Sequence, residues 1–214
     1  MFKLKFIFRY LKYLIISKGA NSIHSPFVFN LYYKVIKGNI PRKKFRNVEL
    51  LRRELLHNHK TIKIEDFGAG SHTNNKSNIR KIKQIVAASS MKPKFCRMLA
   101  SIAGHFNTEV ILELGTSAGF STMYLANQCP YAKIYTIEGS EEIYTLACEN
   151  FNKLNYNNIY AINDIFENAL EKTLKKINKV DFVLFDGNHK KEPTLNYFDK
   201  CLQYFDDSSV FIFD

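Results

Sequence analysis

Short apolar runs alternate with helix-compatible stretches along the second half of the chain. Each stretch between two runs is long enough for a crossover helix, and its apolar residues have helical spacing, as at Leu170, Leu174 and Ile177. This strand and helix alternation predicts an α/β fold with a doubly wound, mainly parallel sheet. The predicted strands cover Glu109 to Leu114, Lys133 to Glu138, Asn158 to Ile162, Asp181 to Asp186, and Ser209 to Asp214.

The first hundred residues have a helical pattern instead. Ser25 and Pro26 favour a helix start, because serine caps free backbone N–H groups and proline is tolerated in the first turn. The predicted helices cover Phe27 to Ile36, Asn47 to Leu56, Ile79 to Ala88 and Pro93 to Ala103. We therefore predict two parts, a helical N-terminal cap at residues 1–104 that contacts the substrate and an α/β core at residues 105–214.

The chain has a formal net charge of +11, and its basic residues are dense in the first hundred positions. Such a charge suits a nucleic acid or an anionic membrane, but no nucleic-acid-binding motif accompanies it, so we do not predict a nucleic-acid partner. A compositional bias toward Lys, Asn, Ile, Tyr and Phe is the simpler explanation.

Residues 1–16 are apolar and basic, and Lys3, Lys5, Arg9 and Lys12 interrupt the apolar sequence. This segment is too interrupted to span a bilayer, and no cleavage site of a signal peptide follows it. It predicts an amphipathic helix, docked on the protein's own core or in peripheral contact with a membrane.

The four cysteines, Cys96, Cys129, Cys148 and Cys201, are scattered and form no C-x-x-C pair. Neither a zinc site nor a disulfide framework is indicated, so we expect a reducing, cytoplasmic setting.

The loop after the first predicted core strand reads Glu113-Leu114-Gly115-Thr116-Ser117-Ala118-Gly119-Phe120-Ser121. In an open parallel sheet, ligands bind beyond the carboxyl ends of the strands, and the two glycines permit a tight turn close to a ligand. The loop lacks the G-x-G-x-x-G fingerprint of dinucleotide-binding proteins and the Gly-Lys-Ser/Thr of a P-loop, which disfavours hydride transfer and excludes a P-loop.

The loop resembles motif I of class I S-adenosylmethionine-dependent methyltransferases, in particular the small O-methyltransferases related to the catechol and caffeoyl-CoA enzymes. The resemblance covers about residues 109–214, because three further landmarks follow in order: Tyr135-Thr136-Ile137-Glu138-Gly139, Asn163-Asp164 and Phe185-Asp186-Gly187-Asn188-His189. The usual central glycine of motif I is Ser117 here. That fold normally finishes with a sixth strand and an antiparallel seventh, and we expect both to be missing from this chain, which is either truncated or ends its sheet on an exposed fifth strand.

The resemblance implies a site for S-adenosylmethionine. Glu138 and the adjacent Gly139 would bind the two ribose hydroxyls, and Asp164 would lie near the adenine amino group. The remaining implied cofactor residues hold the methionine end or lie next to it: Glu113, Gly115, Thr116, Ser117, Gly119, Ser121 and Asp186.

The resemblance also implies the reacting groups. In the metal-dependent relatives the aspartate that corresponds to Asp186 binds a divalent cation, and a lysine three residues later acts as the base. Here His189 replaces that lysine, and an imidazole is a credible base for a hydroxyl proton. Asp214 matches the second metal-binding aspartate, so Asp186 and Asp214 are the candidate ligands for Mg²⁺.

The predicted function is methyl transfer from S-adenosylmethionine to an oxygen of a small molecule, and homodimer formation stays open. Two alternatives are a non-catalytic or RNA-directed binding module that uses the basic cap and a nicotinamide-dependent oxidoreductase. A second glycine pattern, from Glu65 to Ser71, lacks a following apolar helix, so we predict a turn in the cap near the mouth of the site. Tyr32, Tyr33 and His72 of the cap do not identify the methyl acceptor.

Overall fold

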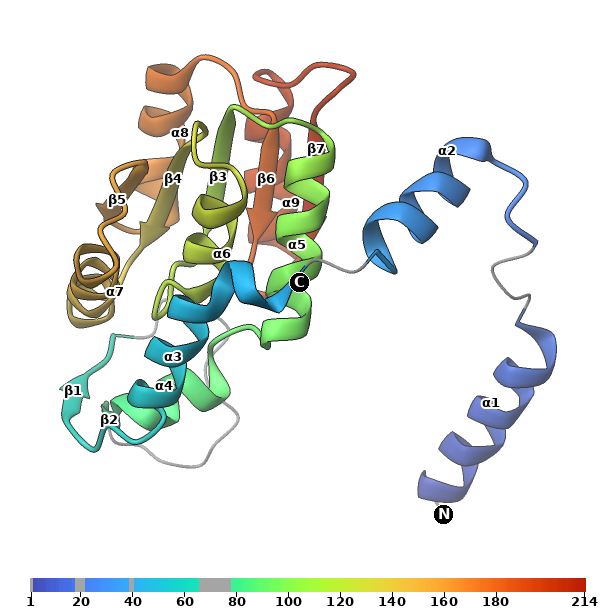
Figure 1. The fold of residues 1–214 in the computed structure, drawn as a ribbon, viewed down its shortest axis with the longest axis horizontal. Helices are drawn as coiled ribbons and strands as arrows, with labels where there is room; N and C mark the ends of the chain where they lie inside the picture. Colours follow the sequence, from blue (N-terminus) through green and yellow to red (C-terminus); the bar gives the residue numbers. More distant parts are fainter. Residues whose placement is uncertain (1, 18–21, 39–40, 66–77) are drawn as a thin grey trace. The chain divides into compact units, whose positions relative to one another are not determined.

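The runs predicted as strands form one parallel sheet in the computed structural model, which describes residues 2–17, 22–38, 41–65 and 78–214 (Figure 1). The strand order is β5-β4-β3-β6-β7, and every neighbouring pair is parallel. The strands are β3 (Val110–Leu114), β4 (Lys133–Glu138), β5 (Ile159–Asn163), β6 (Phe182–Phe185) and β7 (Val210–Phe213). The doubly wound fold is therefore confirmed. In the described part of the chain no sixth strand and no antiparallel seventh strand join this sheet.

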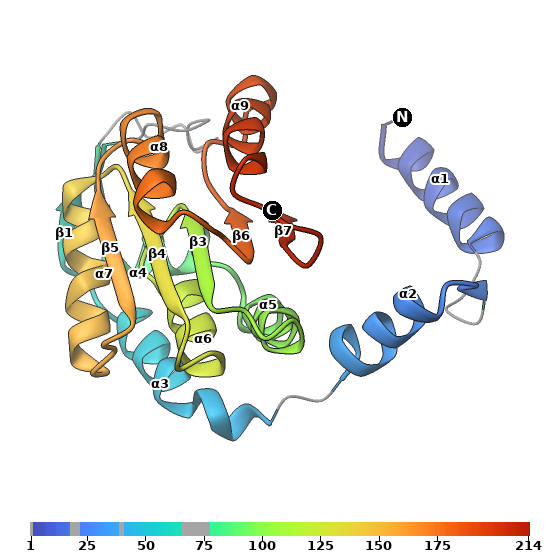
Figure 2. The ribbon, with the colours of Figure 1, turned by 90° about the horizontal axis from the view of Figure 1, so that it is seen from above.

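Helices cover both faces of the sheet, as Figure 2 shows. On one face α8 (Phe166–Ile177) and α9 (Lys191–Leu202) pack against strand residues such as Leu112, Ile137 and Val183. The other face carries α5 (Pro93–His105), α6 (Phe120–Gln128) and α7 (Glu141–Lys153). The central strands β3, β4 and β6 are apolar and largely buried because both faces are covered, which is typical of parallel sheets.

Strand order reverses at β3, because the chain runs outward to β4 and β5 and then returns to place β6 on the other side of β3. At such a switch point the loops after neighbouring strands diverge and leave a crevice beyond their carboxyl ends. The loops after β3, β4 and β6 meet there.

Residues 41–105 pack as part of the same compact unit as the sheet, which comprises residues 40–214. They form a 3₁₀ turn (Arg42–Phe45), α3 (Arg46–Leu55), a short hairpin of β1 (Thr61–Lys63) and β2 (Ile79–Lys81), α4 (Ile82–Ala88) and α5. The boundary between units thus lies between residues 39 and 40, whereas the sequence pattern placed a cap boundary at residue 104.

The prediction of a helix from Ile79 to Ala88 is wrong at its beginning. Ile79, Arg80 and Lys81 pair antiparallel with Lys63, Ile62 and Thr61, and the helix starts only at Ile82. This pairing joins residues far apart in the sequence, and a three-residue strand has too short a pattern to reveal it. The first hundred residues are accordingly not purely helical.

Residues 1–39 form the other compact unit, which is described by itself. It contains α1 (Phe2–Ile16), α2 (Pro26–Asn30) and a π-helical continuation (Leu31–Ile36). The predicted helix start is present, since the Ser25 hydroxyl accepts a hydrogen bond from the Val28 backbone N–H at 3.3 Å and Pro26 occupies the first turn. None of the helices in the described ranges combines the length and the apolar character that crossing a bilayer requires.

Candidate active site

A cavity of about 600 Å³ opens at the switch point of the sheet. Its walls come from the loops after β3, β4 and β6 and, opposite them, from residues 85–95 of α4, α5 and their connection. This volume lies within the ordinary range for small-molecule sites. Seven residues predicted from the sequence line it, namely Gly115, Ser117, Glu138, Gly139, Asp186, His189 and Asp214.

Gly115 brings the loop after β3 against the loop after β6. Its φ is +104°, and a Cβ atom there would lie 2.2 Å from the carbonyl oxygen of Asp186, so only glycine fits. Gly119 has φ +79° and precedes the first turn of α6. A Cβ on Gly119 would meet the Phe151 ring at 2.4 Å, so this glycine serves helix packing and is not among the residues that line the cavity.

Both carboxylate oxygens of Glu138 are fixed by backbone N–H groups. Oε2 accepts from Ser117 at 2.9 Å, and Oε1 accepts from Ser140 at 3.1 Å. Burial raises the pKa of Glu138, and the backbone hydrogen bonds oppose that shift. Backbone N–H groups of Gly139 and Thr116 also lower this pKa, so the loop holds the carboxylate in place at the cavity wall.

Glu113 lies beneath the loop and does not line the cavity. Its Oε2 accepts from the Thr122 hydroxyl at 2.5 Å and from the Thr136 hydroxyl at 2.7 Å, and Thr136 shares a further bond of 2.6 Å with the Thr116 hydroxyl. Burial raises the pKa of Glu113, opposed by hydrogen bonds from Ser121, Thr122 and Thr136. This network joins β3, β4 and the start of α6, so it fixes the glycine loop from below.

Besides Glu113 and Gly119, three of the predicted residues lie away from the main cavity. Thr116 and Ser121 line a small crevice between the loop and the segment Ser89–Met91. Asp164 lies just before α8, where its Oδ1 accepts from the Ile165 backbone N–H at 2.8 Å and from the Asn168 side-chain amide at 3.1 Å. A contact of Asp164 with a nucleoside stays a prediction.

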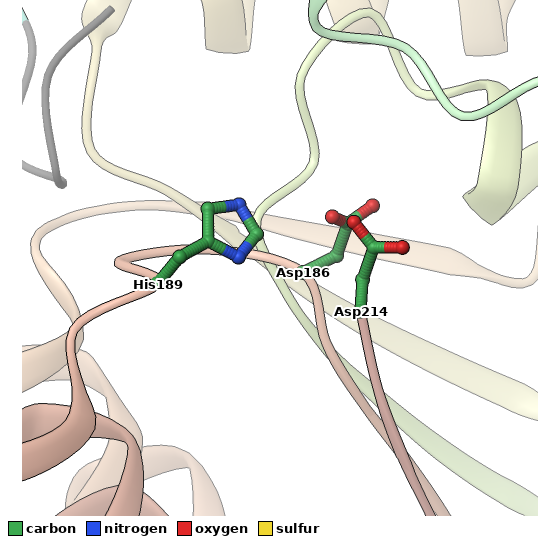
Figure 3. Close-up of side chains that lie close together, drawn as sticks. All are labelled: Asp186, His189 and Asp214. Carbon is green, nitrogen blue, oxygen red and sulfur yellow. The ribbon is translucent and has the colours of Figure 1, made fainter. Parts of the chain in front are cut away.

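Asp186, His189 and Asp214 converge at the carboxyl ends of β6 and β7, and Figure 3 shows their side chains close together. One potential ligand atom from each residue lies within 4.8 Å of the other two. Burial raises the pKa of Asp186 to about 8, and the charge of Asp214 adds to this shift. A divalent cation would relieve the repulsion between the two carboxylates, so the donor set of two oxygens and one imidazole nitrogen fits a metal.

No sequence pattern indicated the opposite wall of the cavity. Ser89, Ser90 and Met91 reach the cavity because Arg52 of α3 holds the segment, donating to the carbonyl oxygens of Met91 at 2.8 Å and Ser90 at 3.1 Å. Apolar residues of the wall, among them Ile143, Ile165 and Phe166, follow the ends of β4 and β5. Asp66 to Ser71 and His72, predicted near the mouth, lie outside the described residues, whereas Glu65 does line the cavity.

Three buried polar atoms around the cavity and the adjacent crevice have no hydrogen-bond partner within the described residues. They are the hydroxyl oxygens of Ser90 and Ser117 and the side-chain carbonyl oxygen of Asn188. An unpaired buried polar atom is costly and calls for a partner, which a bound ligand or water can supply. The site is therefore built for a polar ligand with several donors and acceptors.

The fold and the site agree with the resemblance to class I methyltransferases, because a glycine loop follows the first strand of the parallel sheet and an acid ends the second. Residues 112–214 match the family model described as a methyltransferase domain. This part of the chain is thus a methyltransferase domain, and the relationship predicted from motif I is confirmed. A search of curated protein sequences gave no match.

Solved structures agree on the fold. An O-methyltransferase from Bacillus cereus in complex with SAH is 18% identical, with a TM-score of 0.59, over 86% of this chain and 70% of that one. The SAH-bound methyltransferase PaMTH1 from Podospora anserina is 18% identical, with a TM-score of 0.58, over 90% of this chain and 70% of that one. The O-methyltransferase TomG from Streptomyces achromogenes, in complex with SAM, is 21% identical, with a TM-score of 0.53, over 59% of this chain and 57% of that one.

Proposed function

We propose that this chain transfers a methyl group from S-adenosylmethionine to an oxygen atom of a small molecule. The observation that carries the proposal is the Glu138 carboxylate at the cavity wall, with both oxygens held by backbone N–H groups. Two acceptors on a rigid strand end match the vicinal hydroxyls of a ribose. The three relatives described above were crystallised with SAH or SAM.

The residues present fit this cofactor. Gly115 leaves room for close backbone approach, the unpaired Ser117 hydroxyl faces the same loop, and apolar Ile143 and Phe166 suit an adenine ring. The bound cofactor would supply an electrophilic methyl group on a sulfonium. The enclosing walls would orient the acceptor and exclude water, which are the main protein contributions to such a transfer.

His189 and Asp186 would prepare the acceptor. An imidazole beside two carboxylates is placed to accept a hydroxyl proton, and a divalent cation held by Asp186 and Asp214 would stabilise the resulting oxyanion. The nicotinamide alternative has no support, because the loop lacks the required glycines and the matched domain is a methyltransferase.

A reducing, cytoplasmic location belongs to the same proposal. All four cysteines are unpaired, and Cys96, Cys129 and Cys201 are buried. Free buried thiols are typical of proteins in reducing compartments.

Isothermal titration of the full chain with S-adenosylhomocysteine tests cofactor binding. We expect Glu138→Ala to weaken binding by roughly 100-fold, because two hydrogen bonds to a charged group are lost. Glu141→Ala, an exposed acid three residues later, is the matched control and should bind like the wild type. Glu138→Gln keeps one acceptor oxygen in a side chain of the same size, so it shows whether weaker binding in Glu138→Ala comes only from misfolding. Equal affinity of Glu138→Ala and Glu141→Ala would overturn the proposed cofactor site.

Methyl transfer from labelled S-adenosylmethionine to a panel of hydroxyl compounds, catechol included, tests the acceptor. We expect O-methylated product, strong loss of turnover in His189→Ala and Asp186→Asn, and loss on chelation that Mg²⁺ restores. Product methylated on nitrogen or carbon would overturn the oxygen assignment, and activity unaffected by chelation would overturn the metal.

A further inference from the structure

The first 48 residues of this protein are strongly basic. The first 48 residues contain eleven Lys and Arg residues and no Asp or Glu, which accounts for the whole formal charge of +11. The remaining residues carry twenty basic and twenty acidic side chains and are formally neutral. That sum combines eleven basic and five acidic residues at 49–111 with nine basic and fifteen acidic residues at 112–214, so a general bias does not raise the charge throughout the chain. Residues 1–48 contain no acid at all, which points to an anionic partner for this segment.

Helix α1 has a basic side and an apolar side, although Ile16 also lies on the basic side. At 100° per residue, three basic residues fall on one side, whereas five apolar residues fall within an arc of roughly 120° on the other. The basic residues are Lys5, Arg9 and Lys12. The apolar residues, spaced at helical intervals, are Ile7, Phe8, Leu11, Leu14 and Ile15.

Within its own unit, the described residues leave the apolar side of α1 uncovered. Phe8 is 75% exposed and Ile15 is 85% exposed, and Ile7, Leu11 and Leu14 are each exposed by about half. A contiguous apolar surface of this kind marks a site of interaction. Since α1 lacks the length and the apolar character that crossing a bilayer requires, a membrane could bind it only at the membrane surface.

The basic side and the apolar side of α1 together indicate which kind of partner binds this helix. A nucleic acid would engage the basic side chains and leave the five apolar residues in water, because phosphate contacts dominate that kind of binding. An anionic lipid surface engages both, since headgroups attract Lys and Arg while the apolar side chains enter the acyl boundary. Tyr10 and Tyr13 suit the headgroup level, where such rings gather.

We propose that α1 binds in the plane of an anionic membrane surface, with Ile7, Phe8, Leu11, Leu14 and Ile15 toward the acyl chains and Lys5, Arg9 and Lys12 toward the headgroups. This binding would bring the methyltransferase domain to the membrane. It does not depend on the identity of the methyl acceptor.

Vesicle co-sedimentation of the full chain measures the binding. We expect binding to vesicles of phosphatidylcholine with phosphatidylglycerol, much weaker binding to phosphatidylcholine alone, and a decrease with added salt. The triple variant K5Q/R9Q/K12Q should bind roughly 100-fold more weakly. The control K133Q/K172Q/K176Q removes three exposed charges from the other unit and should stay within about twofold of the wild type, as expected if the site lies in α1.

A fluorescent reporter places the helix, because the chain has no tryptophan. Phe8→Trp, on the apolar side, should show a blue shift and protection from an aqueous quencher when anionic vesicles are added. Tyr13→Trp, on the opposite side of the helix, should show little protection.

Four results would overturn the proposal. They are no binding to anionic vesicles, equal weakening in both triple variants, Phe8→Trp emission already blue-shifted without lipid, and binding of a fluorescent single-stranded RNA in preference to the vesicles. The third result would indicate docking on the protein itself or on a second copy, and a mass measurement in solution separates these two. Titration with S-adenosylhomocysteine is unaffected by any of these variants, so failure here leaves the proposed function standing.

Discussion

Replacing Arg52 with methionine should destabilise the protein and loosen the wall of the cavity that faces the glycine loop. The guanidinium is buried and donates to the carbonyl oxygens of Met91 at 2.8 Å, Ser90 at 3.1 Å and Val86 at 3.4 Å. It also lies 4.8 Å from the centre of the Phe120 ring. Arg52 therefore joins α3 to the segment after α4 and to the start of α6.

The magnitude follows from these contacts. The two shorter hydrogen bonds should each contribute about 1.5 kcal/mol, and the ring contact about 1 kcal/mol. Methionine leaves the carbonyl groups without their donor but also removes the cost of a buried charge, which is the cause of the lowered pKa of Arg52. We therefore expect a net loss of about 2–4 kcal/mol, a large part of the stability of an ordinary domain.

Urea unfolding followed by circular dichroism measures this loss. The midpoint should fall by roughly 1–2 M for Arg52→Met, and the matched variant Arg53→Met, one position along the same helix and exposed, should leave it unchanged. Affinity for S-adenosylhomocysteine should fall with Arg52→Met because Ser90 and Met91 line the cavity. Equal midpoints for the two variants would refute the assignment of Arg52 as the residue that holds this wall.

Three further outcomes follow from the site. Gly115→Ala should cost about 2–4 kcal/mol in urea unfolding, from its positive φ and the close Asp186 carbonyl, whereas Gly104→Ala, which meets only a flexible glutamine side chain, should cost little. Thr136→Val should cost about 1–2 kcal/mol in the same assay, because Glu113 loses a buried donor; no change would contradict this role. With divalent cations chelated, the free energy of unfolding should fall as the pH rises from 5 to 8. The cause is that Asp186 has a pKa of about 8 in the folded protein and keeps a proton that the unfolded chain releases near pH 4. Asp214→Asn should flatten this pH dependence, because the charge of Asp214 contributes to the raised pKa.

The sheet could be predicted because its signals are local. The β4 strand matches the predicted range Lys133 to Glu138 at both ends, since an apolar run there is bounded by turn residues. Glu138 and Asp186 could be assigned to one site from their positions along the chain, because carboxyl ends of parallel strands meet at one edge of the sheet. The resemblance implied that Asp214 lies beside Asp186, and the structure brings the two side chains together.

The features that could not be predicted depend on distant pairing. The β1–β2 hairpin and the Arg52 bridge both join segments that carry no common motif. The sequence also predicted Glu113 at the methionine end of the cofactor, which stays a prediction, but it did not indicate that Thr122 and Thr136 would bind its Oε2 beneath the loop. Motif and spacing locate such an acid, but only the packing around it decides which groups it can reach.

The overall composition also has limited predictive value. The overall charge of +11 can be explained by a general bias, and as a single sum it does not distinguish that explanation from a specific partner. Its distribution does, because the methyltransferase domain at residues 112–214 has more acidic than basic residues, whereas the first 48 residues contain no acid. Electrostatic attraction acts over about a Debye length, so charge that is gathered on one segment binds a surface that the same charge, spread over the whole protein, would not. Catalysis and attachment can therefore have separate origins in this chain, one in the strand ends and the other in the first helix.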